Sequence, residues 1–136
     1  MSVPEIFFDK KILIVDDANS IRMLARSILL DVGFKSVSQA KNGQDALNIL
    51  KRVPIDVVIC DWNMPLMDGL ELFKIMHADS ELKQIAFIML TSSSETVKVK
   101  AAISAGISDY ILKPFNADTL VKHLVESLQK QIPESL

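Results

Sequence analysis

Side chains able to bind a cation or a phosphoryl group directly follow four apolar runs of this chain. The first run ends at the adjacent carboxylates Asp16 and Asp17, and the others end at Asp61, Thr91 and Lys113. Carboxylates a few ångströms apart repel one another by about 4 kcal/mol per close pair at an effective dielectric of about 20. A site that combines three of them therefore requires a cation.

The expected chemistry of such a site is metal-assisted phosphoryl transfer. Lys113 supplies one positive charge, while three oxygen-bearing acids favour a hard divalent ion, and Mg²⁺ suits a site that retains several waters. The expected ligands are Asp17, Asp61 and a neighbouring backbone carbonyl. Asp61 is the best-placed nucleophile toward phosphorus, because positioning and charge neutralisation supply most of phosphoryl-transfer catalysis. Thr91 would donate a hydrogen bond to a phosphoryl oxygen. The ammonium group of Lys113 would move toward the negative charge of the newly bound phosphoryl group.

The aspartates and Thr91 also have a purely structural explanation. An Asp at the end of a strand is often the N-cap of the following helix, and either Thr91 or Ser92 could cap a helix in the same way. The pair Asp16-Asp17 is the hardest to explain structurally, because one cap needs one acid and a second acid only adds repulsion.

Five apolar runs alternate with five segments of helical periodicity. The predicted strands cover residues 11–15, 36–40, 56–60, 86–90 and 110–112. The first predicted helix has its apolar face at Ile21, Leu24, Ala25, Ile28 and Val32 and ends at Gly33, and the next two cover residues 43–52 and 70–77. Ser92 and Glu95 form a capping-box pattern that opens the fourth helix, which Gly106 ends. The apolar face of the fifth consists of Ala117, Leu120, Val121, Leu124 and Leu128, and Pro133 stops its extension.

This alternation predicts an α/β fold: a doubly wound, five-stranded parallel sheet with five helices. The order 2-1-3-4-5 is favoured, because the strand at 36–40 mixes polar and apolar positions as an edge strand does and the strand at 110–112 is short. Sites in open α/β sheets lie at the carboxyl ends of the strands, where the strand order reverses. The polar residues described above should therefore meet at one rim.

Composition narrows the class of protein further. With 136 residues, 49% of them hydrophobic, the chain is expected to form one domain over residues 1–136, with its core at about 11–130. The net charge of −2 and the scattered basic residues suggest neither nucleic-acid nor membrane-surface binding. No apolar run is long enough to span a bilayer, so a cytoplasmic protein is expected. A monomer is also expected. Cys60 is expected to be buried, and His77 and His123 to be solvated.

Four motifs occur in the order of a known family: Val15-Asp16-Asp17, the run DWNMPLMDGLEL from Asp61 to Leu72, Thr91, and YILKPF from Tyr110 to Phe115. Together they resemble the receiver domains of two-component response regulators, most closely the single-domain chemotaxis regulators of the CheY type. The resemblance implies the flavodoxin-like version of the sheet, which has the same 2-1-3-4-5 order.

The resemblance implies a role for each matching residue. Asp61 would be the phosphoacceptor for a histidine kinase, and Asp16 and Asp17 the acidic pair that organises Mg²⁺. The backbone carbonyl of Asn63 would complete the metal shell. Thr91 and Lys113 would sense the phosphoryl group.

Further resemblances concern the switch and the surroundings of the site. Tyr110 would turn inward as the Thr91 hydroxyl moves, although an edge-strand aromatic packed against the fourth helix explains it equally well. The Lys113-Pro114 bond would be a cis peptide. Trp62, Asn63 and Ser93 would tune the site, with Trp62 at its mouth. Ser93 stands where chemotaxis members commonly have an acidic residue, which bears on the rate of dephosphorylation.

The function expected from the resemblance is a phosphorylation switch rather than an enzyme. The fourth helix, fifth strand and fifth helix would form the protein-binding face, with a flagellar switch protein, a phosphatase or a histidine phosphotransfer protein as partner. Only Pro133-Glu134-Ser135-Leu136 follow the last helix, so a protein contact is the expected output. Chemotaxis is the favoured role, and a phosphorelay or adaptor receiver is the alternative.

Two other classes of protein fit the residues less well. A phosphatase of the haloacid dehalogenase type needs a DxD motif after the first strand, where this chain has Asp16-Asp17-Ala18. A flavodoxin-like electron carrier needs a phosphate loop rich in Ser, Thr and Gly at the same place. The sequence there, DDANS, does not provide one.

Overall fold

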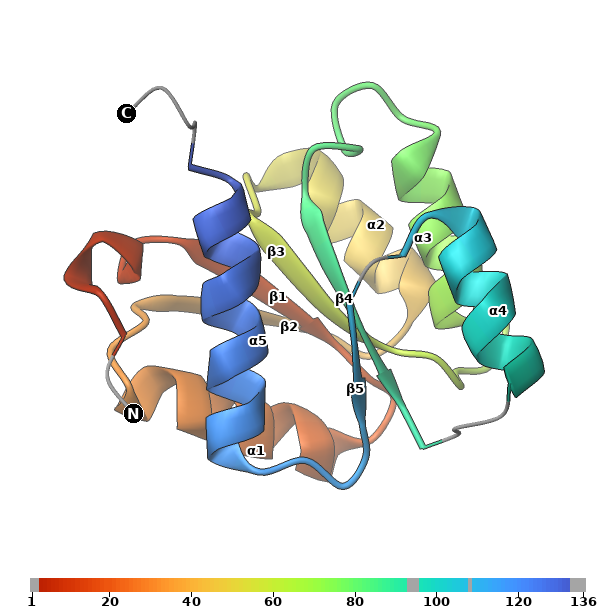
Figure 1. The fold of residues 1–136 in the computed structure, drawn as a ribbon. Helices are drawn as coiled ribbons and strands as arrows, with labels where there is room; N and C mark the ends of the chain where they lie inside the picture. The colour runs from red at the N-terminus through yellow and green to blue at the C-terminus, as the bar shows by residue number, and fades with distance from the viewer. Residues whose placement is uncertain (1–2, 93–95, 108, 133–136) are drawn as a thin grey trace.

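The computed structural model describes residues 3–92, 96–107 and 109–132. Its centre is a five-stranded parallel sheet with the order β2-β1-β3-β4-β5, which confirms the predicted α/β fold (Figure 1). The strands are β1 (Lys11–Val15), β2 (Ser36–Ala40), β3 (Val57–Asp61), β4 (Ala86–Thr91) and β5 (Tyr110–Leu112). The helices are the short 3₁₀ turn η1 (Glu5–Phe7), α1 (Asn19–Asp31), α2 (Gly43–Arg52), α3 (Gly69–His77), α4 (Thr96–Ala105) and α5 (Ala117–Lys130).

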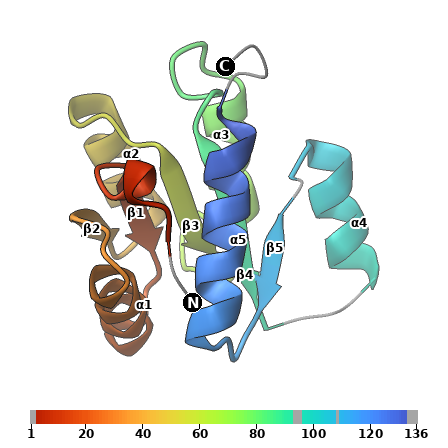
Figure 2. The same ribbon diagram turned by 60° about the vertical axis from the view of Figure 1, so that its left-hand side comes forward.

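Two hydrophobic layers enclose the sheet, because successive side chains of a strand point to opposite faces. In β1, Ile12 and Ile14 join the layer under α1 and α5. Leu13 and Val15 join the layer under α2, α3 and α4. Figures 1 and 2 show the helices divided between the two faces in this way. The central strands therefore bury both faces, whereas β2 at the edge is only half-buried.

Most helix boundaries follow from local signals. Asn42, Asp68 and Asn116 cap α2, α3 and α5 with side-chain oxygens that accept backbone N–H groups. Gly33 follows α1 with a φ of +117°, as its predicted stop signal requires. In α1 the N-cap is Ala18, which makes no side-chain capping bond. The junction between β1 and α1 must be held in another way.

Several details differ from the sequence expectations. β3 begins and ends one residue later than predicted, so Asp61 is the last residue of the strand. The buried face of α1 includes Leu29, while Leu24 is 47% exposed, because the helix presents its Ala25–Leu29 side to the sheet. Ala117 of α5 is likewise exposed. The proposed capping box at Glu95 and the stop at Pro133 lie outside the described residues.

The segment before β1 adds to the core. Phe7 of η1 is buried in the layer under α1 and α5, which no sequence pattern indicated. Within the described ranges, none of the helices combines the length and the apolarity needed to cross a bilayer.

Candidate functional site

The polar residues predicted to share a rim lie at adjacent strand ends. Asp16 directly follows β1, Asp61 and Thr91 are the last residues of β3 and β4, and Lys113 directly follows β5. The parallel register aligns these ends, with Val15 opposite Cys60, Asp61 opposite Leu90 and Thr91 opposite Leu112. Four strands therefore deliver their polar residues to the carboxyl edge of the sheet.

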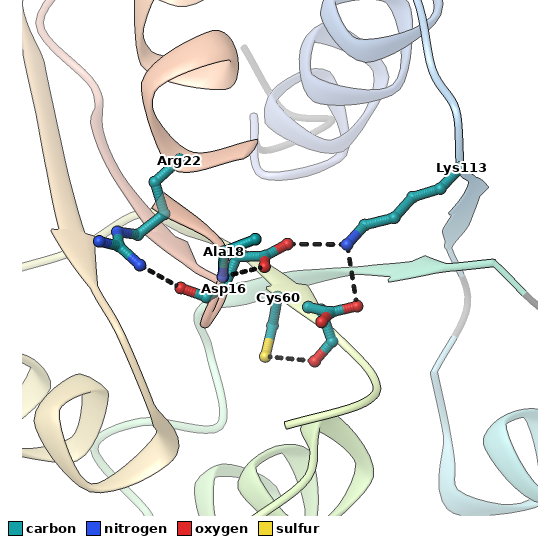
Figure 3. A network of polar contacts seen from close by, with 6 residues as sticks. Asp16, Ala18, Arg22, Cys60 and Lys113 are labelled. Atoms are coloured by element: carbon teal, nitrogen blue, oxygen red, sulfur yellow. Dashed lines mark hydrogen bonds and ion pairs between the residues drawn. The ribbon is translucent and has the colours of Figure 1, made fainter. Parts of the chain in front are cut away.

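Lys113 connects two of the carboxylates. Its Nζ lies 2.8 Å from Asp16 Oδ2 and 3.1 Å from Asp61 Oδ1. Figure 3 shows its side chain reaching across to Asp16. Asp16 is fully buried and Asp61 is 6% exposed, so water screens these ion pairs little. The lysine thus compensates part of the charge that the strands bring together.

Asp16 has a positioning role in addition to its charge. Its Oδ1 accepts the backbone N–H of Ala18 at 2.9 Å, and its Oδ2 accepts Lys113. Asp17, by contrast, is exposed. Asp16 is therefore anchored through both oxygens, whereas the exposed Asp17 is open to a ligand.

The three carboxylates fit a hard divalent cation. Asp16, Asp17 and Asp61 each offer an oxygen, and these oxygens lie within 4.8 Å of one another. Carboxylate oxygens are the ligands that Mg²⁺ and Ca²⁺ prefer, and an exposed Asp17 leaves room for the waters that Mg²⁺ retains. The donor set therefore matches the metal expected from the sequence.

Burial raises the pKa of Asp61, and the neighbouring charge of Asp16 raises it further, against the opposing effect of Lys113. Burial lowers the pKa of Lys113, but its hydrogen bond to Asp16 and the charges of Asp61 and Asp16 outweigh this, so the net shift is upward. Lys113 therefore remains a cation, and Asp61 is a carboxylate whose charge the folded chain disfavours.

The loop after Asp61 folds back tightly over the strand end. The backbone N–H of Trp62 donates to Leu90 O at 2.9 Å, and that of Gly69 donates to Trp62 O at 2.9 Å. A Cβ on Gly69 would lie 2.5 Å from Asp61 O, so only glycine fits at this first position of α3. This close contact fixes the position of the Asp61 backbone carbonyl.

The structure also places the remaining residues singled out in the sequence. Thr91 is buried, and its carbonyl accepts the Lys113 N–H at 2.8 Å. Asn63 is exposed, whereas Trp62 is 7% exposed and packs in the layer under α2 and α3. Tyr110 is 40% exposed on β5. Ser93 lies outside the described residues.

Four further placements concern the end of the last strand, the two histidines and the cysteine. The Lys113–Pro114 peptide bond is cis. The expectation that His123 is solvated is wrong, because its Nδ1 lies 2.6 Å from Asp109 Oδ1. Asp109 precedes β5 and His123 is in α5, and spacing along the chain gave no sign that the two meet. His77 is exposed as expected and stacks on Phe73. Cys60 is buried, and burial raises its thiol pKa.

Arg22 has no role among the sequence predictions, yet its guanidinium lies 2.6 Å from the backbone oxygen of Asp16. A basic residue six positions after the first acid was the available signal. It could not be distinguished from a charge on a solvated helix face.

Comparison with known proteins identifies the family of this chain. The family model described as a response regulator receiver domain matches residues 12–125. Chemotaxis protein CheY-3 of Vibrio cholerae is 42% identical over 114 residues, covering 84% of this chain and 88% of that protein. Chemotaxis protein CheY of Pseudomonas aeruginosa is 35% identical over 122 residues, covering 90% of this chain and 98% of that protein.

A solved structure gives the same result for the fold. The chemotaxis response regulator CheY4 of Vibrio cholerae superposes with a TM-score of 0.79 at 35% identity, covering 91% of this chain and 99% of that one. The match of the family model covers every strand end that contributes to the rim. The chain therefore belongs to the response regulator receiver domain family, and within it the sequence is CheY-like.

Proposed function

We propose that this protein is a phosphorylation switch in which Asp61 accepts a phosphoryl group from a phosphohistidine on a kinase. The observation that supports this most directly is the position of Lys113 Nζ, within 3.1 Å of both Asp16 and Asp61 at a rim of three carboxylates. Such an arrangement presents a nucleophilic carboxylate together with a cation able to neutralise the incoming charge.

Each side chain would have a separate task in this reaction. Asp17, Asp61, the anchored Asp16 and the backbone carbonyl of Asn63 would hold Mg²⁺, which would screen the charge between the carboxylate and the phosphoryl oxygens. An oxygen of Asp61 forms the new bond to phosphorus as the bond from phosphorus to the donor nitrogen breaks. Lys113 and Thr91 would stabilise the transferred group by an ion pair and a hydrogen bond.

The proposed output is a change at the face formed by α4, β5 and α5. Lys113 and Thr91 lie at the ends of β5 and β4, so a phosphoryl group held by both would act directly on these strands. Exposed apolar side chains occur on this face at Ile103, Tyr110 and Leu112. We infer that a flagellar switch protein binds here, as the similarity to chemotaxis proteins supports.

Acetyl phosphate labelling tests the proposal. With Mg²⁺, the wild-type chain should gain one acid-labile phosphoryl group, and Asp61→Asn should gain none, because an amide cannot form the acyl phosphate. Asp118→Asn, which changes an exposed carboxylate of α5, is the matched control and should label normally. Labelling that persists in Asp61→Asn would refute the acceptor assignment.

The output is tested separately. Phosphorylated and unphosphorylated protein would be used to capture partners from the host lysate, followed by identification of those that bind differentially. A flagellar switch protein enriched on the phosphorylated form supports the chemotaxis role. A histidine phosphotransfer protein in its place would contradict that role and indicate a phosphorelay.

A further inference from the structure

Arg22 of α1 binds three parts of the molecule at once. Its Nη1 donates to the backbone oxygen of Asp16 at 2.6 Å and its Nη2 to Asn19 Oδ1 at 3.0 Å. Its Nε donates to Gln39 Oε1, in the edge strand β2, at 3.3 Å. The guanidinium is therefore hydrogen-bonded to side chains of α1 and β2 and also to the backbone just after β1.

The Asp16 oxygen belongs to the peptide group that leads into Asp17. Because a peptide group is planar, fixing this oxygen fixes the plane from which the Asp17 backbone starts. The other contacts of Asp16 act on different atoms, namely the carboxylate bonds to Ala18 and Lys113 and the N–H bond to Ala40 O at 3.2 Å. Figure 3 shows Arg22 and Lys113 approaching Asp16 from opposite sides.

The junction between β1 and α1 lacks the side-chain N-cap that fixes the starts of α2, α3 and α5. α2, α3 and α5 are each capped by a side chain, whereas α1 follows Ala18 and has no side-chain cap. The exposed Asp17 lies between the anchored Asp16 and this uncapped start. Its position therefore depends on the contacts of Asp16, and the Arg22 bond is the shortest hydrogen bond there.

We propose that Arg22 is a positioning residue for the metal site: by clamping the Asp16 carbonyl it holds Asp17 where its carboxylate shares a cation with Asp61. This inference rests on the proposed function, which supplies the cation. Two effects of Arg22 on Mg²⁺ have opposite signs. Its positive charge repels the ion, whereas its clamp organises the ligands, so the direction of change on removing Arg22 separates the two.

Mg²⁺ titration of two Arg22 variants measures whether the affinity for Mg²⁺ falls or rises when Arg22 is replaced. Tryptophan fluorescence and calorimetry are independent readouts. Arg22→Met should weaken Mg²⁺ binding by about tenfold or more, the scale on which outer-shell partners of metal ligands act. Arg22→Lys keeps the charge but loses the planar fork, so its affinity should fall between those of Arg22→Met and the wild type. Arg26→Met, one turn along α1 at an exposed position, is the matched control and should bind Mg²⁺ as the wild type does.

The proposed role of Arg22 also predicts how the labelling rate depends on Mg²⁺ concentration. In acetyl phosphate labelling, Arg22→Met should need more Mg²⁺ for half-maximal rate and should approach the wild-type rate at saturating Mg²⁺. Gln39→Ala removes one support of the guanidinium at the edge strand and should weaken Mg²⁺ binding less than Arg22→Met. It should have no further effect when combined with Arg22→Met.

Equal or tighter Mg²⁺ binding by folded Arg22→Met would overturn the clamp and show that its charge dominates. If Arg22→Met does not fold, wild-type Mg²⁺ affinity in Gln39→Ala overturns the clamp instead. The proposed function fails in a distinguishable way, because the wild type itself would then neither bind Mg²⁺ nor be labelled at Asp61.

Discussion

The folded chain disfavours the ionised form of the Asp61 side chain. Burial and the charge of Asp16 raise its pKa above the ordinary value of 3.8, with partial compensation by Lys113. The folded state therefore binds a proton at Asp61 more strongly than the unfolded state does. For such a group, stability falls as pH rises through the interval between the ordinary pKa and the raised one, and the cost is fully present above the raised pKa. The proposed phosphoacceptor is thus also a source of instability.

Asp61→Asn is therefore expected to stabilise the metal-free protein at pH 7. With EDTA present, its unfolding temperature should exceed that of the wild type by about 3–5 °C, which corresponds to roughly 1 kcal/mol in a domain of this size. The difference should shrink as the pH is lowered toward 3.8, where Asp61 becomes protonated. Thermal denaturation followed by circular dichroism measures this, with the exposed Glu81→Gln as control. A lower unfolding temperature than the wild type at pH 7 would contradict the prediction.

Leu66 is strained and gains nothing from burial. Its φ is +71°, the Met67 N–H bonds back to Pro65 O at 2.8 Å, and its side chain is fully exposed at 102%. A left-handed conformation costs a residue with a Cβ about 1–2 kcal/mol, more than the conformational entropy that glycine adds to the unfolded chain. Leu66→Gly should therefore increase the free energy of unfolding by about 0.5 kcal/mol or more, measured by urea denaturation. Ile6→Gly, at an exposed position in η1, should not stabilise, and an equal gain there would refute the explanation.

At the scale of elements, the first residues of α2 and α3 pack closely against the segment between Asp61 and Met67. Gly43 and Gly69 each occupy the first position of a helix, and neither has room for a Cβ. Their neighbours differ in kind, because Gly43 faces the flexible side chain of Met67 and Gly69 faces the backbone of Asp61 and Trp62. The same substitution should therefore have unequal consequences at the two helices.

Gly69→Ala is expected to cost about 2 kcal/mol or more of stability, because the backbone of Asp61 cannot move aside as a side chain can. Gly43→Ala should cost less, since the Met67 thioether can adopt another rotamer. Urea denaturation of both variants gives the comparison, and acetyl phosphate labelling of folded Gly69→Ala should be slower as Asp61 is displaced. A larger loss at Gly43 than at Gly69 would contradict this reading of the contacts.

At the scale of the whole molecule, the rim joins both halves of the sheet. Residues from β1, β3, β4 and β5 contribute to it, so a ligand at the rim contacts segments that are nearly 100 residues apart, as Asp16 and Lys113 are with a separation of 97. A cation bound there stabilises only the folded chain, because the unfolded chain does not assemble its ligands.

Mg²⁺ should therefore raise the unfolding temperature of the wild type in a saturable way. At ten times the dissociation constant, the expected stabilisation is about 1.4 kcal/mol. Asp17→Asn and Asp61→Asn should respond much less, because each loses a charged ligand. Scanning calorimetry over a range of MgCl₂ concentrations, with equal ionic strength maintained by NaCl, separates binding from screening. An equal rise in all three proteins would show that Mg²⁺ does not act at the rim.

The amount that could be predicted from the sequence depended on whether a signal was local. The boundaries of β1, β2, α2 and β5 followed from apolar runs and breakers, and the strand order followed from the polarity of β2 and the shortness of β5. Asp16, Asp17, Asp61, Thr91 and Lys113 could be placed at one rim because parallel strands end at the same edge of a sheet. Leu24 was assigned to the wrong face of α1, because the periodicity of a helix does not reveal the side on which a sheet lies.

The sequence by itself determined the fold class and the chemical character of the rim, since both depend on residue types and their order along the chain. It favoured the strand order that the structure has. Only the tertiary structure decided how the charges are shared: Lys113 pairs with both Asp16 and Asp61, Asp109 pairs with His123, and Arg22 holds the Asp16 carbonyl. These contacts join residues on different elements, and their geometry depends on how helices pack against the sheet. Short-range spacing in the chain contains no information about that packing.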